Sequence, residues 1–134
     1  MRDAPEPTRA GPCVLVVDDD RGVRRVVRHL VETWGYVCAE ASSGPLALQR
    51  IADGGVALVL TDVEMPSGDG MSLVRAVAGR GLGMPPIIAL SGLGLDAIAD
   101  GAVTAGALAV VPKPFDPAFL RGAVDLLMRR TVRR

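Results

Sequence analysis

Five short and mostly apolar runs divide the chain at regular intervals. They cover residues 13–17, 36–40, 56–60, 87–91 and 108–111. Apolar runs of this length, without alternating polar positions, are typical of strands that are buried on both faces of a parallel sheet. The pattern therefore predicts five buried strands.

Between these runs, apolar residues recur at the spacing of three and four that a helix produces. Asp20 is placed to cap the first helix, and Asp116-Pro117 is a typical start for the last one. The segment 92–107 is rich in glycine and alanine, so its helix is weak by propensity. The residues expected to face the core are Val23, Val26, Val27, Leu30, Val31 and Trp34 in the first helix, Leu46, Ala47, Ile51 and Ala52 in the second, and Phe119, Leu120, Ala123, Val124, Leu127 and Met128 in the last.

The alternation of strands and helices predicts an α/β fold with right-handed crossovers and helices on both faces of the sheet. For five strands we expect a flavodoxin-like, doubly wound (βα)5 domain with the parallel order 2-1-3-4-5. The domain is expected to cover residues 13–130. Residues 1–12, with three prolines, are expected to be a disordered leader or linker, and residues 131–134 a basic tail.

Composition narrows the function classes. Aromatic residues make up only 3% of the chain against 49% hydrophobic residues, so the core must be aliphatic. A net charge of zero favours neither nucleic acid nor a membrane surface as a partner. The start lacks a signal-peptide pattern. Cys13 and Cys38 have no metal-ligand spacing around them, and we expect free buried thiols in a cytoplasmic protein.

Polar residues gather where the predicted strands end. Asp18 and Asp19 follow the first strand, Asp62 the third, Ser91 ends the fourth and Lys113 follows the fifth. In the order 2-1-3-4-5 these strands are neighbours, so the side chains should converge on one edge. Neighbouring carboxylates repel one another unless a cation neutralises them, and Mg²⁺ is the expected ion, with Mn²⁺ as the alternative. Lys113 is the one lysine among fifteen basic residues, which favours a specific role for its ammonium group.

Four segments of the chain together resemble the receiver domain of two-component response regulators. They are Val14-Leu-Val-Val-Asp-Asp-Asp20, Thr61-Asp62-Val-Glu-Met-Pro66 with Asp69-Gly70, Ala89-Leu-Ser91, and Lys113-Pro114-Phe115. Each segment alone is weakly specific. Their occurrence in this order at the predicted strand ends makes the resemblance highly specific, and it covers roughly residues 13–130.

The resemblance implies a role for each of these residues. Asp62 would be the phosphoacceptor, taking a phosphoryl group from a phosphohistidine on a histidine kinase or a histidine phosphotransfer protein. Asp19 and Asp62 would bind Mg²⁺ directly, Asp18 mainly through water, and Glu64 through its backbone carbonyl. Lys113 would pair with Asp62 at rest and with a phosphoryl oxygen afterwards, and Ser91 would bind another phosphoryl oxygen. The resemblance also implies a cis Lys113–Pro114 bond.

The same resemblance implies a signalling domain and not a turnover enzyme. Nucleic acid and membrane are not expected as direct partners, and the face of the fourth helix, fifth strand and fifth helix is the candidate surface for a dimer. Two other functions stay open. An aspartate-nucleophile phosphatase would use Glu64 as its general acid, and a pseudo-receiver would bind partners without being phosphorylated.

Three departures from the family pattern bear on signalling. Val110 stands where many receivers carry an aromatic switch residue, and Gly92 stands where alanine is common. With the glycine- and alanine-rich helix that follows, this predicts that residues 92–107 change order on phosphorylation. The Glu64 side chain is expected to lie at the rim of the site, free of contacts with the other site residues.

Overall fold

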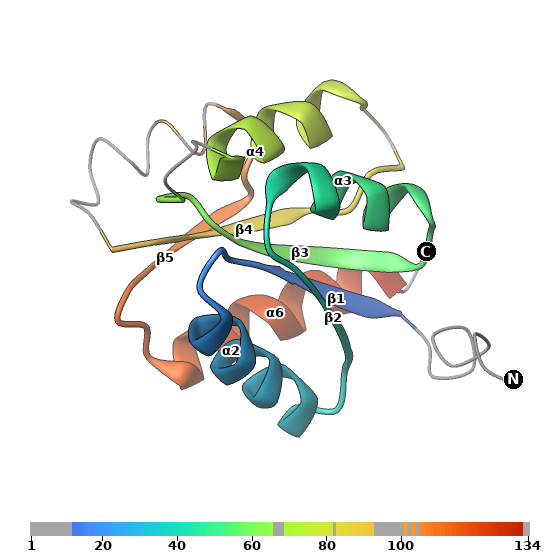
Figure 1. Ribbon diagram of the computed structural model, residues 1–134. Coiled ribbons are helices and arrows are strands. Elements are labelled where there is room, and N and C mark those ends of the chain that lie inside the picture. Colours follow the sequence, from blue (N-terminus) through green and yellow to red (C-terminus); the bar gives the residue numbers. More distant parts are fainter. Residues whose placement is uncertain are drawn as a thin grey trace, which may run out of the picture.

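The computed structural model describes residues 12–65, 69–81, 83–92, 101, 103 and 105–132 (Figure 1). Five parallel strands form one sheet in the order β2-β1-β3-β4-β5, as predicted. The strands are β1 (Cys13–Val17), β2 (Val37–Ala41), β3 (Val56–Asp62), β4 (Ile87–Ser91) and β5 (Ala109–Pro112), and the helices with described bounds are α2 (Arg21–Thr33), α3 (Gly44–Ala52), α4 (Asp69–Gly79) and α6 (Pro117–Val132).

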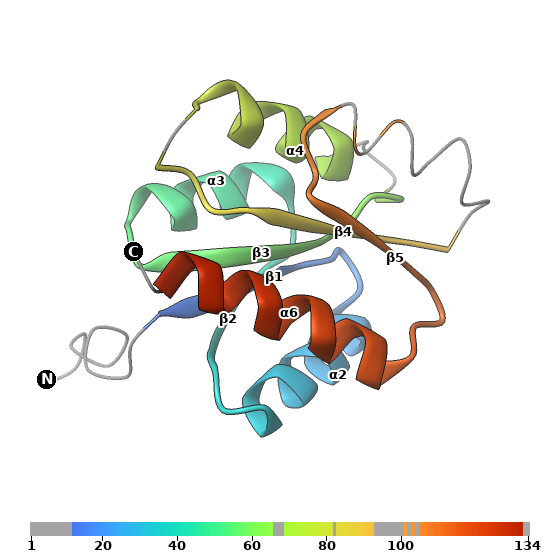
Figure 2. The same ribbon diagram turned by 180° about the vertical axis from the view of Figure 1, so that it is seen from behind.

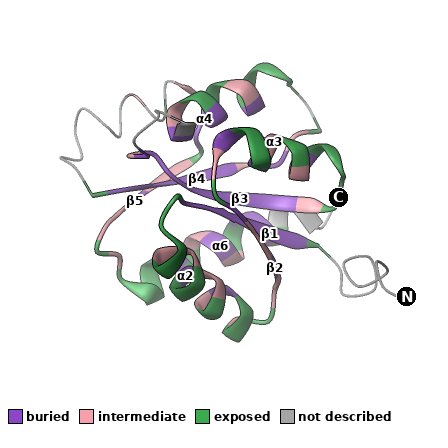
Figure 3. Ribbon diagram, viewed as in Figure 1, coloured by how far each residue is buried: buried purple, intermediate pink, exposed green. Residues whose placement is uncertain are grey.

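The helices cover both faces of the sheet. Figures 1 and 2 show α3 and α4 on one face and α2 and α6 on the other. Successive side chains of a strand point to opposite faces of the sheet. In β1, Val14 and Val16 therefore pack with α2 and α6, whereas Leu15 and Val17 pack with α3 and α4. All five residues of β1 are buried, which is the physical reason for its unbroken apolar sequence (Figure 3).

The predicted inward faces of three helices are too wide. Val26 is 58% exposed, Leu46 48% and Phe119 57%, so their placement in the core was wrong. A helix lying on a sheet buries one stripe, and in α2 that stripe contains Val27 and Val31. Val26 lies about 100° around the helix from Val27, which is enough to turn it to solvent.

Two strands begin one residue later than their apolar runs suggest. Tyr36 is still part of the turn that ends α2, because its N–H donates to the carbonyl of Val31 at 3.3 Å. Leu108 is 60% exposed and precedes β5. The predicted change of order in residues 92–107 falls mainly on positions outside the described residues.

Local capping and packing follow the sequence. The Asp20 side chain accepts a hydrogen bond from the Val23 N–H at 3.1 Å, and Asp116 does the same for Ala118 at 2.9 Å at the start of α6. Cys13 and Cys38 are free and buried as expected, and burial raises the pKa of the Cys38 thiol to about 12. No helix in the described part of the chain is long and apolar enough to span a membrane.

Tyr36 is expected to titrate at unusually high pH. Burial raises the pKa of its phenol to about 12, helped by the hydrogen bond that the hydroxyl donates to Asp125. Its contribution to stability is therefore complete below pH 10 and is lost as the pH rises towards 12. Tyr36 is the chain's one tyrosine, so absorbance of phenolate in a pH titration reports this group alone.

Replacing Asp125 by asparagine is the matched control. It removes the negative charge beside the phenol but not the burial, so the titration midpoint should fall only part of the way towards 10. Fluorescence of Trp34, the one tryptophan, would show that the protein is still folded during the titration. A wild-type midpoint at the ordinary tyrosine value would contradict the prediction.

Candidate functional site

The register of the sheet brings the predicted site residues to one edge. Val17 pairs with Thr61, so the residue after each of them, Asp18 and Asp62, lies at the same level of the sheet. On the other side of β3, Asp62 pairs with Leu90, so Ser91 lies one residue further on. Ser91 in turn pairs with Pro112, the residue before Lys113. The sheet thus collects residues that are far apart in sequence.

Three carboxylates form an acidic cluster at this edge: Asp18, Asp19 and Asp62. One oxygen from each lies within 4.8 Å of the others. Asp18 is 3% exposed and Asp62 5% exposed, whereas Asp19 is open to solvent. The cluster therefore has two buried members and one side through which an ion or a substrate can approach.

Asp18 is a buried carboxylate of the cluster that is only partly hydrogen-bonded by the described residues. Its Oδ1 accepts a hydrogen bond from the Asp20 N–H at 2.8 Å, but its buried Oδ2 has no hydrogen-bond partner among the described residues. Burial is the main cause that raises the pKa of Asp18, and the negative charges of Asp62 and Asp19 add to it. A buried carboxylate oxygen without a partner is the kind of group that a cation would satisfy.

Among the described residues, a cation and a backbone N–H contact the Asp62 carboxylate. Lys113 Nζ lies 3.1 Å from Asp62 Oδ1, and the same oxygen accepts the Glu64 N–H at 3.0 Å. The expected resting pair of Lys113 and Asp62 is therefore present. The Lys113–Pro114 bond is cis, as expected, and the Lys113 N–H donates to the Ser91 carbonyl at 2.7 Å.

Gly70 supports Asp62 from behind. A Cβ atom at Gly70 would lie 2.2 Å from the Asp62 carbonyl oxygen and 2.6 Å from the Val63 Cα. Helix α4 therefore begins directly against the end of β3, at a distance that only glycine permits. The sequence patterns did not predict this contact.

The Glu64 side chain is not the free rim residue that we expected. Its carboxylate accepts hydrogen bonds from the Ser91 hydroxyl and from the Gly92 N–H, the second at 2.7 Å. The expectation was wrong because Glu64 and Ser91 are 27 residues apart, and only the pairing of β3 with β4 brings them together. Ser91 itself is fully buried.

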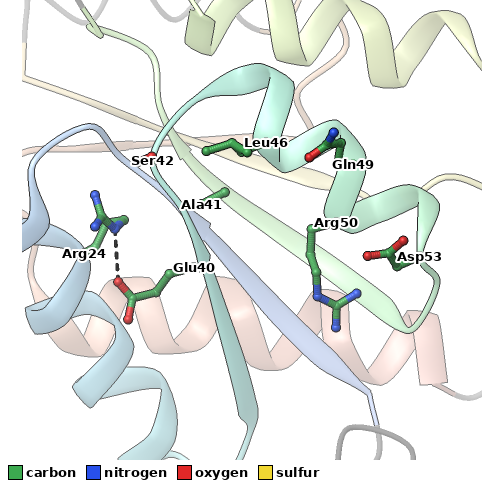
Figure 4. A pocket seen from close by; sticks show the side chains of 8 residues that line it. All are labelled: Arg24, Glu40, Ala41, Ser42, Leu46, Gln49, Arg50 and Asp53. Atoms are coloured by element: carbon green, nitrogen blue, oxygen red, sulfur yellow. Dashed lines mark hydrogen bonds and ion pairs between the residues drawn. The ribbon is translucent and has the colours of Figure 1, made fainter. Parts of the chain in front are cut away.

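Arg24 is a residue near the site that the sequence patterns did not single out. Its guanidinium donates to the Asp18 carbonyl at 2.8 Å and to Glu40 at 3.0 Å, so it ties β1, α2 and β2 together beside the acidic cluster. Arg28 also bonds Glu40, and it is the main cause that lowers the Glu40 pKa, before Arg24. Figure 4 shows Arg24 and Glu40 lining a cleft at the edge of the sheet, between α2 and α3.

Val110, at the position where many receivers have an aromatic residue, is partly buried. It lies on β5 opposite Ala89 and packs against the core layer of α3 and α4. An aliphatic side chain packed this way has no ring to move between an outer and an inner position. That phosphorylation acts through another element, by a switch that differs from the aromatic one, stays a prediction.

Comparisons with known proteins point to one family. A family model described as the response regulator receiver domain matches residues 14–125. The chain is 33% identical to the transcriptional regulatory protein ResD of Bacillus subtilis over 117 residues, which are 87% of this chain and 48% of ResD. It is 34% identical to the response regulator MprA of Mycobacterium tuberculosis over 120 residues, which are 88% of this chain and 51% of MprA. The chain thus spans about half the length of these two relatives.

Two solved structures are also similar to this chain, one of a receiver domain and one of a chemotaxis protein. The receiver domain of the Francisella response regulator 1452 has a TM-score of 0.82 to this chain at 29% identity, and the match covers 90% of this chain and 99% of the other. The chemotaxis protein CheY4 of Vibrio cholerae has a TM-score of 0.79 at 27% identity, covering 87% and 98%.

Proposed function

Because this chain belongs to the response regulator receiver domain family, we propose that it is a phosphoacceptor in a two-component phosphorelay and that Asp62 takes the phosphoryl group. The observation that carries the proposal is the position of Asp62. Its carboxylate contacts the Lys113 ammonium at 3.1 Å and also lies within 4.8 Å of the carboxylate oxygens of Asp18 and Asp19. A nucleophilic carboxylate beside a cation and a potential metal site is what phosphoryl transfer requires.

The residues of the acidic cluster fit Mg²⁺, with Mn²⁺ as the alternative. The set consists of oxygen donors, which hard divalent ions prefer, and it contains Asp18 Oδ2, a buried oxygen that no described residue hydrogen-bonds. We assign Asp19 and Asp62 as direct ligands, Asp18 as a ligand mainly through water, and the Glu64 backbone carbonyl as a further ligand. When bound, the ion would neutralise negative charge on the phosphoryl oxygens and the carboxylates.

The chain's own residues account for the rest of the transfer. An oxygen of the Asp62 carboxylate forms a P–O bond while the P–N bond of the phosphohistidine breaks. The bonding electron pair returns to the imidazole, which leaves neutral because its other nitrogen carries a proton. Lys113, which pairs with Asp62 at rest, is proposed to bind one phosphoryl oxygen, and the Ser91 hydroxyl is proposed to bind another.

The proposed partner is a histidine kinase or a histidine phosphotransfer protein, and the product is an acyl phosphate that a partner or an output domain reads. Both cysteines are free thiols, which fits a reducing compartment, so we place the relay in the cytoplasm. For self-association we propose the face that contains β5 and α6, where Leu126 is 51% exposed. Direct binding of nucleic acid is not part of the proposal.

The geometry favours this function over a phosphatase. A phosphatase of the aspartate type would need the Glu64 carboxylate as a proton donor to the leaving group. In the structure that carboxylate is an acceptor of two hydrogen bonds, from Ser91 and Gly92. The intact pair of Asp62 and Lys113 likewise argues against a pseudo-receiver.

The test is incubation with Mg²⁺ and acetyl phosphate, followed by measurement of the intact mass. The wild type should gain one phosphoryl group, and neither Asp62→Asn nor the wild type in excess chelator should gain it. Asp53→Asn is the matched control, because Asp53 is an exposed aspartate at the end of α3 and should leave the gain unchanged. An unmodified wild type, or equal modification of Asp62→Asn, would overturn the proposal.

A further inference from the structure

Glu64 uses both of its carboxylate oxygens at the end of β4. Oε2 accepts the Ser91 hydroxyl, and Oε1 accepts the Gly92 N–H at 2.7 Å. These are charge-assisted hydrogen bonds, which are about twice as strong as neutral ones. They connect the loop after β3 to the end of β4, where Glu64 and Ser91 are 27 residues apart in the sequence.

The two donors that Glu64 holds lie at the border of the phosphoacceptor site. A Cβ atom at Gly92 would lie 3.8 Å from the Lys113 Cβ and 4.0 Å from its Cε. The Lys113 ammonium contacts Asp62, and the Glu64 N–H contacts the same Asp62 oxygen. Glu64 is therefore bonded to Asp62 through its backbone and to Ser91 through its side chain.

We infer that Glu64 is a positioning residue that holds the Ser91 hydroxyl and the Gly92 N–H in the resting state, and that phosphorylation of Asp62 releases both. This inference rests on the proposed function. A phosphoryl group on Asp62 brings oxygen acceptors and negative charge to this border. The oxygens compete with Glu64 for the same two donors, and the charge repels its carboxylate.

The release of Glu64 provides a structural signal that needs no aromatic residue. Glu64 lies between the end of β3 and α4, and Gly92 opens the segment that follows β4. Breaking their hydrogen bond removes a direct connection between Glu64 and Gly92. Val110, packed as an aliphatic residue on the neighbouring strand, does not have to move.

Three substitutions of Glu64 separate the contact from the charge. Glu64→Ala removes both and should raise the rate of phosphorylation by acetyl phosphate roughly tenfold, about the factor of one charge-assisted hydrogen bond. Glu64→Asp keeps the charge but is one methylene too short to reach both donors, so it should also be faster than wild type. Glu64→Gln keeps the length and one good acceptor, so its rate should lie between those of the wild type and Glu64→Ala.

Glu32→Gln is the matched control, since Glu32 is an exposed glutamate at the end of α2 and its loss should leave the rate unchanged. In the Ser91→Ala background the gain from Glu64→Ala should be smaller, because only the Gly92 contact remains to be released. The Gly92 amide resonance provides a direct readout. It should shift when beryllofluoride and Mg²⁺ are added to the wild type, and it should already be shifted in resting Glu64→Ala.

The outcomes are distinguishable. If the wild type takes up no phosphoryl group, the proposed function fails and the role of Glu64 fails with it. If the wild type is phosphorylated but Glu64→Ala and Glu64→Asp react at the wild-type rate, only the role of Glu64 is overturned. A Glu64→Asp variant that matches the wild type while Glu64→Ala is faster would assign the effect to charge alone and would also overturn the inference.

Discussion

Gly70→Ala should unfold more easily and should lose most of its phosphorylation. The new methyl group would meet the Asp62 carbonyl oxygen at 2.2 Å and the Val63 Cα at 2.6 Å, and both are backbone atoms that cannot rotate away. Either α4 or the end of β3 must move. Overpacking of this kind typically costs about 1–3 kcal/mol of the free energy of unfolding, and we expect the upper end of that range.

The same displacement should affect chemistry, because Asp62 lies at the contact. A shift of the nucleophile by about 1 Å can lower a rate about a hundredfold. Urea unfolding and the rate of phosphorylation by acetyl phosphate measure the two effects. Gly79→Ala is the matched control in the same helix, where a Cβ meets nothing within 4 Å. It should be neutral or slightly stabilising. A Gly70→Ala protein with the midpoint and rate of the wild type would show that the two elements are not in contact.

Asp18→Asn should change protein stability in opposite directions without and with Mg²⁺. In chelator, the substitution removes a buried negative charge that lies beside two other carboxylates, and asparagine still accepts the Asp20 N–H. We expect the variant to be more stable than the wild type by about 1 kcal/mol. With Mg²⁺ the wild type should overtake it. Ligand binding at a hundred times the dissociation constant adds about 2.7 kcal/mol, and the variant should need at least tenfold more metal.

Thermal or urea unfolding in chelator and in a series of Mg²⁺ concentrations tests this reversal. Asp20→Asn is the matched control, because asparagine caps a helix as well as aspartate does and Asp20 lies outside the acidic cluster. It should change neither stability nor metal dependence by much. An Asp18→Asn variant that is less stable than the wild type in chelator would contradict the prediction. It would show that the buried Asp18 oxygen, which no described residue hydrogen-bonds, does not destabilise the folded protein.

Most of the fold was predictable because its signals are local. Five apolar runs, a capping aspartate before α2 and the Asp-Pro start of α6 report on their own neighbourhoods, and the structure confirms them. The errors in the helices have one cause. Val26 and Phe119 are as apolar as the residues that are buried, and only the position of the sheet decides which side of a helix faces it.

The site divides in the same way. It could be predicted that four polar residues lie together, because each stands at the end of a strand and parallel strands bring those ends to one edge. These residues are Asp18, Asp62, Ser91 and Lys113. Their assignment to phosphoryl transfer came from the resemblance of the four segments together. Arg24 could not be predicted, because its contact with the Asp18 carbonyl depends on how α2 lies against β1 and β2.

By itself, then, the sequence determined the order of elements, the aliphatic core and the set of polar residues at the strand ends, because periodicity and chain order are written in it directly. The tertiary structure alone decided that Asp18 has an oxygen without a hydrogen-bond partner in the described part of the chain, that Gly70 touches Asp62, and that Glu64 holds Ser91 and Gly92. These facts depend on distances between segments that are remote in sequence, and such distances exist only once the strands have paired.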